Sequence, residues 1–150
     1  MNNKQVAINW RNQEGAKRVK NMFYEGRTIY SYGYHFPMGF LTNRQHNSAQ
    51  IVLLNADTYS SSTQRHQSYV KQVCSNDAIV EAKTRLLSEA KAQLEHLGTL
   101  SEHVKSEIKS DIEARIRHIA DIKDRARRLK YVHEMDILNL LKQLETLKTL

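Results

Sequence analysis

Apolar residues recur every three or four positions through the second half of the chain, a pattern that indicates amphipathic helices. Val80, Leu87 and Leu94 repeat every seven residues, and a second apolar stripe runs through 104–129. Gly98 lies between the two stripes, where glycine commonly ends a helix. We therefore predict a helix from about Asn76 to Gly98, followed by a second helix that folds back against it.

The second stripe is longer than the first helix can cover. One helix through residues 100–150 would be about 75 Å long, against about 30 Å for its partner. The chain can cover the excess by turning back near 133–136 into a third helix, or a second copy can cover it. We expect self-association, as a homodimer. The apolar residues assigned to this interface are Leu87, Leu94, Ile108, Ile112, Ile119, Leu141 and Leu144.

The first half shows shorter patterns that are typical of strands. Alternation through 27–36 would place Tyr30, Tyr32, Tyr34 and Phe36 on one face of a strand. The continuous apolar run 51–54 favours a buried strand. A capping box at Ser61 then predicts a helix to about residue 74.

These elements predict an α+β fold of two parts. Residues 1–75 form a small N-terminal sheet-plus-helix module, and residues 76–150 form a long C-terminal helical hairpin or coiled coil. The boundary is a shift in composition without a linker, because no Gly, Ser or Pro tract marks it.

Composition adds a charge asymmetry to this picture. The 150 residues carry a formal net charge of +7, and residues 1–75 hold nine basic residues against three acidic ones. The single cysteine excludes an internal disulfide. No apolar run approaches the ~20 residues that cross a bilayer. We expect a protein of the cytoplasm that neither enters a membrane nor requires a cofactor.

Three short stretches resemble a known group of proteins. They are Tyr-Ser-Tyr-Gly-Tyr-His-Phe-Pro at 30–37, Asn-Ala-Asp-Thr-Tyr-Ser at 55–60 and Thr-Gln-Arg-His-Gln at 63–67. In this order they resemble small proteins of unassigned activity encoded by bacteriophages and mobile elements. The resemblance covers about residues 20–75 and implies a setting, the host cytoplasm, together with accessory roles such as countering host defence.

The same stretches contain residues that suit metal-independent cleavage of a phosphodiester. One of His35 and His66 would remove the 2′-hydroxyl proton, the other would protonate the leaving oxygen, and Arg65 would balance the phosphate charge. The alternative is that both histidines are structural, while Asn55, Asp57 and Ser60 form turn and cap hydrogen bonds. We favour the structural alternative. The histidine, aspartate and cysteine spacings match no known metal site, so we expect none.

Basic and aromatic residues in the first half also suit nucleic acid, because bases stack on aromatic rings and phosphates pair with cations. The alternative is that the tyrosines are needed for the core. The residues assigned to partner or nucleic-acid binding are Lys17, Arg18, Lys20, Arg27, Arg44, Arg65, Lys71, Tyr32 and Tyr34.

We expect a non-enzymatic accessory protein of phage type that binds and modulates a host protein, a ribonucleoprotein or another nucleic-acid complex. A small nuclease that uses His35 and His66 is one alternative. A structural protein that assembles through its helices alone is the other.

Overall fold

A computed structural model describes residues 1–123 and 130–150 of the chain, and the side chains of 1–121 and 134–150. Helix α1 (Asn3–Asn12) precedes four strands, β1 (Met22–Glu25), β2 (Thr28–Ser31), β3 (Pro37–His46) and β4 (Ala49–Asn55). Helix α2 (Ser61–Val73) and strand β5 (Ala78–Ala82) follow. The chain continues through α3 (Thr84–Leu97), α4 (Glu102–Lys123) and α5 (Lys130–Leu147). None of the described helices is long and apolar enough to cross a membrane.

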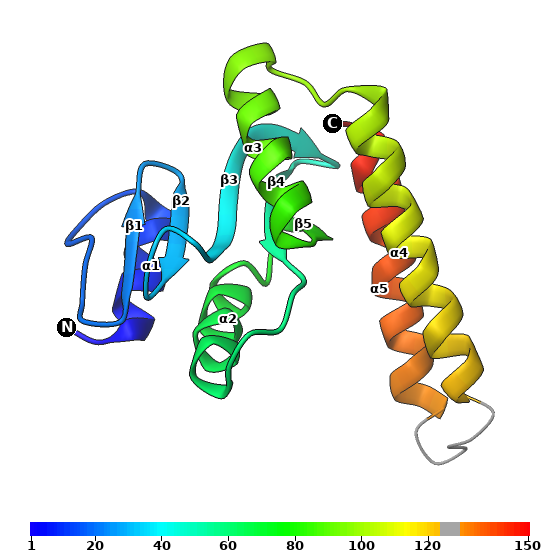
Figure 1. Cartoon of the computed structure of the whole chain (residues 1–150), viewed down its shortest axis with the longest axis horizontal. Coiled ribbons are helices and arrows are strands. Elements are labelled where there is room, and N and C mark those ends of the chain that lie inside the picture. Colours follow the sequence, from blue (N-terminus) through cyan, green and yellow to red (C-terminus); the bar gives the residue numbers. More distant parts are fainter. Residues whose placement is uncertain (124–129) are drawn as a thin grey trace.

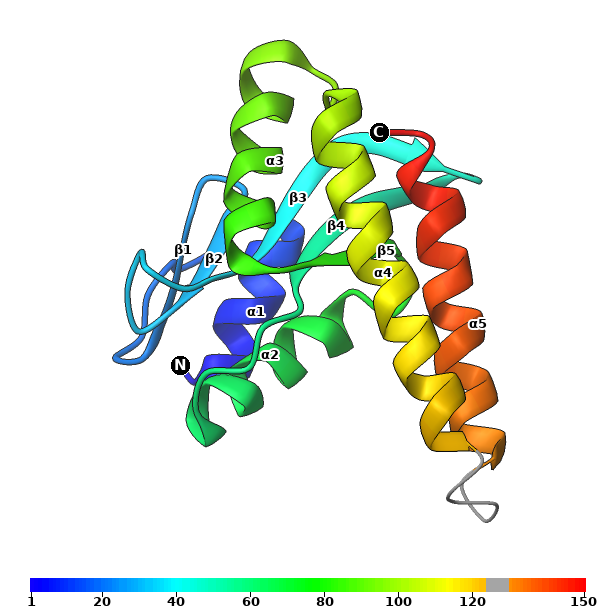
Figure 2. The same ribbon diagram turned by 45° about the vertical axis from the view of Figure 1, so that its right-hand side comes forward.

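The five strands form one sheet in the order β1-β2-β3-β4-β5. The first four run antiparallel to their neighbours, whereas β5 lies parallel to β4 after the crossover through α2. Helices cover both faces of this sheet, with α3, α4 and α5 on the near face in Figure 2 and α1 behind it. The apolar residues accordingly divide into one core on each side of the sheet.

Strand β4 shows why its sequence is a continuous apolar run. Ile51 and Leu53 belong to the core beneath α3, α4 and α5, while Val52 and Leu54 belong to the core beneath α1 and α2. A strand covered on both faces buries every side chain, and all four of these residues are 5% exposed or less. The prediction of a buried strand at 51–54 is confirmed.

The predicted architecture, an N-terminal sheet-plus-helix module followed by a long C-terminal hairpin or coiled coil, is wrong. Helix α1 precedes the sheet, and the sheet continues past residue 75 because β5 pairs with β4. The predicted boundary therefore falls inside the crossover from β4 to β5. The last three helices are short, with 14, 22 and 18 residues, and pack on the sheet or on one another.

The prediction of a helix from Asn76 is wrong over its first two turns. Residues 78–82 form β5, so Val80 packs as a strand residue, and the helix begins at Thr84. Gly98 does end it, with a φ of 75°. Figure 1 shows α4 and α5 side by side as an antiparallel pair. Helix α5 begins at Lys130. The alternative of a chain that turns back into a third helix agrees with this pair, but the turn near 133–136 is misplaced because these residues belong to α5. Residues 124–129 lie outside the described part.

The side chains assigned to self-association divide between core and surface. Leu87, Ile108 and Ile112 are at most 1% exposed within the chain's own core. Leu94, Ile119 and Leu144 are partly buried against the same core. Leu141 is 45% exposed on α5. Most of the apolar stripe is thus covered by the sheet and by the pairing of α4 with α5.

The open edge of β5 is covered by side chains from α4 and α5. The backbone N–H of Glu81 donates to Gln143 Oε1 at 2.9 Å, and Arg115 Nη2 donates to the backbone carbonyl of Glu81 at 2.8 Å. Both main-chain groups of Glu81 are therefore bonded, although no strand lies beyond β5 in the described sheet.

Candidate nucleic-acid interface

Two exposed tyrosines lie in the tight connection between β2 and β3. Strand β2 ends at Ser31, and Tyr32 follows with a φ of 64°, in the left-handed region. The N–H of Tyr32 donates to Asn21 O at 2.9 Å and the N–H of Phe36 to Gly33 O at 3.2 Å, which closes the turn. Tyr32 is 47% exposed and Tyr34 63%, whereas Tyr30 and Phe36 are buried. The predicted ladder of four aromatic rings on one strand face is wrong, because the strand ends before Tyr32.

Tyr34 is held over a small aromatic cluster. The rings of Phe23 and Tyr30 stack with centroids 5.0 Å apart, and Tyr34 meets both edge to face at 5.1 Å. The Arg18 guanidinium lies 4.2 Å from the Phe23 ring centroid on the same cluster. A hydrogen bond to Glu25 raises the pKa of the Tyr34 hydroxyl above its ordinary 10. These contacts orient an otherwise exposed ring.

A third exposed tyrosine comes from the connection between β4 and α2. Tyr59 is 65% exposed, and its ring lies 5.8 Å from that of His35 and 5.6 Å from that of Phe36. The connection before it is anchored, since Asp57 Oδ2 accepts from Thr84 N–H at 2.8 Å. Tyr32, Tyr34, His35 and Tyr59 together are called the tyrosine surface below. It wraps around the end of β2, with Tyr32 against His66 of α2 and Tyr34 against Tyr30 on the side of α3.

His66 belongs to the interior beneath this surface. Its side chain is 3% exposed, with Nδ1 2.7 Å from Ser31 Oγ and Nε2 3.3 Å from the Asn3 amide nitrogen. Tyr32 covers it, with ring centroids 5.3 Å apart. His35 is exposed on the turn, and Arg65 is exposed on α2. The three residues of the nuclease hypothesis therefore differ in environment, and both nitrogens of His66 are engaged inside the protein.

Acid should weaken the fold through His66. Burial, with a smaller contribution from Arg65, lowers the pKa of His66 below its ordinary 6.5. Between the lowered pKa and pH 6.5, the unfolded chain binds a proton at His66 and the folded chain does not. The stability present above pH 6.5 is therefore lost as the pH falls towards the lowered pKa. We expect a lower urea midpoint at pH 5.5 than at pH 7.5, and a smaller pH effect in His66→Gln. An equal pH effect in the variant would contradict this assignment.

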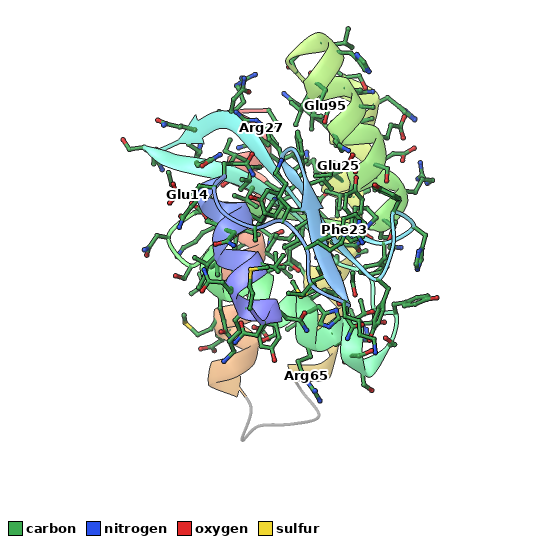
Figure 3. The ribbon with its side chains drawn as sticks, turned by 90° about the vertical axis from the view of Figure 1, so that its left-hand side faces the viewer. Glu14, Phe23, Glu25, Arg27, Arg65 and Glu95 are labelled. Carbon is green, nitrogen blue, oxygen red and sulfur yellow. The ribbon has the colours of Figure 1, made fainter. Side chains whose placement is uncertain are left out.

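The basic residues assigned to binding do not form one patch. Figure 3 shows Arg27 and Arg65 at opposite ends of the face that carries Phe23. Lys17 and Arg18 lie over the rings of Tyr24 and Phe23, and Lys20 is exposed. Lys71 is within 3.5 Å of Glu81. Three of them lie nearest the tyrosine surface. Arg18 is beside Tyr34, Lys20 precedes Asn21, whose carbonyl accepts from Tyr32 N–H, and Arg65 precedes His66, which Tyr32 covers.

Arg44 has a structural position instead. Its guanidinium donates to Gly98 O at 2.8 Å and to Thr149 O at 2.6 Å, and so ties β3 to the end of α3 and to the segment after α5. Carbonyls at helix ends lack partners within the helix, and a cation there satisfies them. Its positive charge is thus directed at the protein rather than at a partner.

Arg44→Met should therefore lower the free energy of unfolding and leave binding unchanged. Losing two hydrogen bonds from a charged donor should cost about 2 kcal/mol in urea denaturation. Lys20→Met is the control, since an exposed lysine should change stability by less than about 0.5 kcal/mol. Equal stability of the two variants would argue against the structural role of Arg44.

The remaining candidate residues are placed without a catalytic arrangement. Asn55 donates to Pro37 O at 2.7 Å and accepts from Asp57 N–H at 2.8 Å, and Ser60 caps α2 by accepting from Thr63 N–H. Burial raises the pKa of the Cys74 thiol to about 12, so it is unreactive at neutral pH. Among the described residues, no group of three or more His, Cys, Asp or Glu side chains is placed to hold a metal ion.

Sequence reasoning missed two residues close to the tyrosine surface. Thr28 is a buried strand residue, and Lys91 lies on α3 with its Nζ 3.4 Å from the Tyr30 hydroxyl. A threonine in a strand and a lysine in an amphipathic helix give no local signal, because only the packing of α3 on β2 and β3 brings them together. No protein-family model, no curated protein and no solved structure matches the chain.

Proposed function

We propose that the protein is a non-enzymatic binding protein whose tyrosine surface holds single-stranded nucleic acid, alone or within a larger complex. One observation carries this proposal. Tyr32, Tyr34 and Tyr59 are 47–65% exposed, yet each is oriented by ring contacts with His66, with Phe23 and Tyr30, or with His35 and Phe36. Large aromatic rings that are held in place at the surface suit stacking with bases better than they suit stabilising the fold.

The surrounding charges suit a phosphate backbone. Arg18, Lys20 and Arg65 are exposed, and in the described part of the chain none of them forms an ion pair within 4 Å. Stacking contributes about 1–3 kcal/mol for each base, and basic side chains follow the backbone. A duplex would keep its bases stacked on one another, so a single strand is the better ligand.

A binding role is supported over nuclease activity by the position of His66. A general base must reach the proton that it removes, and His66 is buried with both ring nitrogens bonded to Ser31 and Asn3. His35 is exposed on the turn, where its ring lies 5.8 Å from that of Tyr59. The position of His66 suits a structural role at the turn, and the position of His35 suits a place in the tyrosine surface.

The biological setting follows from the resemblance to small phage and mobile-element proteins. In that setting the protein is an accessory factor of the host cytoplasm that modulates a host nucleic-acid complex, for example in counter-defence. The uncompensated positive charge of the first 75 residues supports an acidic partner.

The direct test is fluorescence anisotropy with a 12-nucleotide oligothymidine labelled with fluorescein, at several salt concentrations. If about three cations contact phosphates, affinity should fall roughly 20-fold between 50 and 200 mM salt. Replacing Arg18, Lys20 and Arg65 together by Gln should flatten this dependence. The oligonucleotide should be recovered intact after incubation.

Three results would contradict the proposal. Binding that is absent at low salt would redirect the search to a protein partner. An affinity that does not change with salt concentration would show that the basic residues do not contact phosphates. Cleavage of a 12-nucleotide oligouridine, which carries the 2′-hydroxyl that the nuclease hypothesis requires, would support that hypothesis instead if it were lost in His35→Ala.

A further inference from the structure

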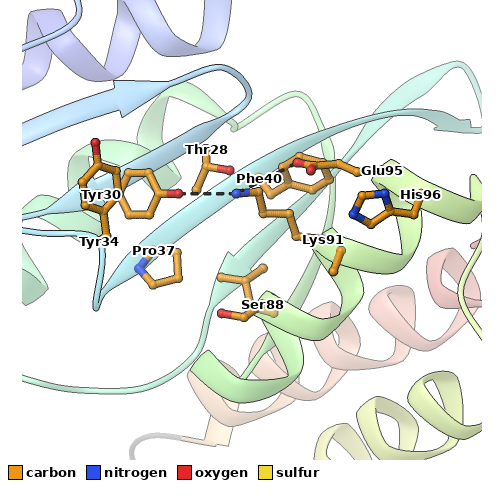
Figure 4. A pocket seen from close by; sticks show the side chains of 11 residues that line it. Thr28, Tyr30, Tyr34, Pro37, Phe40, Ser88, Lys91, Glu95 and His96 are labelled. Atoms are coloured by element: carbon orange, nitrogen blue, oxygen red, sulfur yellow. Dashed lines mark hydrogen bonds and ion pairs between the residues drawn. The ribbon is translucent and has the colours of Figure 1, made fainter.

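A cavity of about 200 Å³ lies beside the tyrosine surface, between α3 and the strands β2 and β3. Tyr34 belongs to both, so the cavity opens next to the rings proposed to stack bases. Figure 4 shows its side chains, which include Thr28, Tyr30, Phe40, Lys91, Glu95 and His96. Liquid water occupies about 30 Å³ per molecule, so this space suits a single flat ring rather than an isolated water.

Hydrogen-bond donors converge at one end of the cavity. The Thr28 side chain is 1% exposed, and its Oγ1 has no hydrogen-bond partner in the described structure. Lys91 Nζ donates to the Tyr30 hydroxyl at 3.4 Å, so the hydroxyl proton of Tyr30 remains free to be donated. In Figure 4 the Thr28 and Tyr30 hydroxyls and the Lys91 ammonium point toward one another. A buried hydroxyl without a partner calls for an acceptor from outside the protein.

The charges of the cavity favour a neutral acceptor over an anion. Glu95 lies with its Oε1 4.0 Å from Lys91 Nζ and balances the ammonium. A phosphate or carboxylate in this space would approach the Glu95 side chain, whereas a carbonyl oxygen would not be repelled. The rest of the lining is largely apolar and includes Pro37, Phe40 and Leu87, which suits the face of a ring.

We propose that this cavity receives one base of the bound strand and selects a base with a ring carbonyl, such as thymine, uracil, guanine or cytosine, over adenine, which has none. The inference rests on the proposed function. Thymine presents its O4 acceptor where adenine presents the N6 amino donor, and the Lys91 ammonium can only donate. The bound base would accept from Lys91 and from the unused hydroxyl of Thr28.

The test compares fluorescein-labelled oligothymidine and oligoadenosine of 12 nucleotides by anisotropy. Oligoadenosine stacks on itself and must unstack to bind, so some preference for oligothymidine is expected without any base readout. Carbonyl recognition is therefore measured as the part of that preference, roughly fivefold, that the Thr28 variant removes. Thr28→Val keeps the branched shape and removes the hydroxyl. It should weaken oligothymidine binding about fivefold and leave oligoadenosine binding unchanged.

Two further variants keep the comparison interpretable. Lys91→Met removes the second donor from a partly exposed position and should also weaken oligothymidine binding selectively, even if Thr28→Val folds poorly. Ser106→Ala removes an exposed hydroxyl on α4 and should change neither affinity. Equal affinity of the two oligonucleotides for the wild type would overturn the base-binding cavity but not the proposed function. Binding of neither would overturn the proposed function and this inference together.

Discussion

Replacing Tyr32, Tyr34 and Tyr59 together by alanine is expected to reduce the affinity for oligothymidine at least about 100-fold. Stacking of one base on an aromatic ring contributes about 1–3 kcal/mol, and three rings at the lower value give about 3 kcal/mol. All three side chains are 47–65% exposed, so much of their surface is free to receive a base. Anisotropy at low salt measures the loss.

The matched control replaces the same three tyrosines by phenylalanine. Phenylalanine keeps the ring and loses only the hydroxyl, so stacking predicts an affinity close to that of the wild type. A loss as large as that of the alanine variant would contradict stacking and assign the binding to the hydroxyls. Circular dichroism on both variants checks that the secondary-structure content of the wild type is retained.

Trp10→Ala is expected to have the largest effect on stability, a loss of about 4 kcal/mol in the free energy of unfolding. Trp10 is fully buried in the core beneath α1 and α2, and its indole N–H donates to Arg27 O at 2.9 Å. The strand beneath it is adapted to the ring. A Cβ added at Gly39 would lie 3.1 Å from Trp10 Cη2 and 3.1 Å from Leu54 Cδ2.

Urea denaturation measures this loss, and Trp10→Phe separates its two causes. Phenylalanine retains most of the buried area and loses the hydrogen bond, so it should cost about 1–2 kcal/mol. If the alanine variant lost less than about 1 kcal/mol, α1 would not be the cover of this face of the sheet.

The elements that could be predicted are those set by local chemistry. The run 51–54 indicated a buried strand, and the capping box predicted at Ser61 was one residue late, because Ser60 caps α2. Gly98 ended a helix as expected. Strand β5 could not be predicted, because Val80 keeps the seven-residue spacing of Leu87 and Leu94. Only its pairing with β4, which is distant in sequence, makes it a strand.

The candidate site was predictable in its residue types and not in their burial. Tyr32 and Tyr34 were assigned to binding and are exposed, but the reason is the turn at Tyr32 rather than a strand face. Arg44 was assigned to the same surface, yet it bonds carbonyls at the ends of two distant helical segments. Whether a polar side chain faces a partner or the protein depends on tertiary contacts that local sequence does not contain.

Both borders of the sheet are occupied by the chain's own groups. At β5 the side chains of Gln143 and Arg115 bond the main chain of Glu81. At β1 the segment 17–19 lies alongside, with Val19 N–H donating to Met22 O and Tyr24 N–H to Lys17 O, both at 2.9 Å. Such cover keeps sheets from aggregating through their edges. At Glu81 of β5 and at Met22 and Tyr24 of β1, the main chain is therefore already bonded, so a strand from a partner could not pair at these positions.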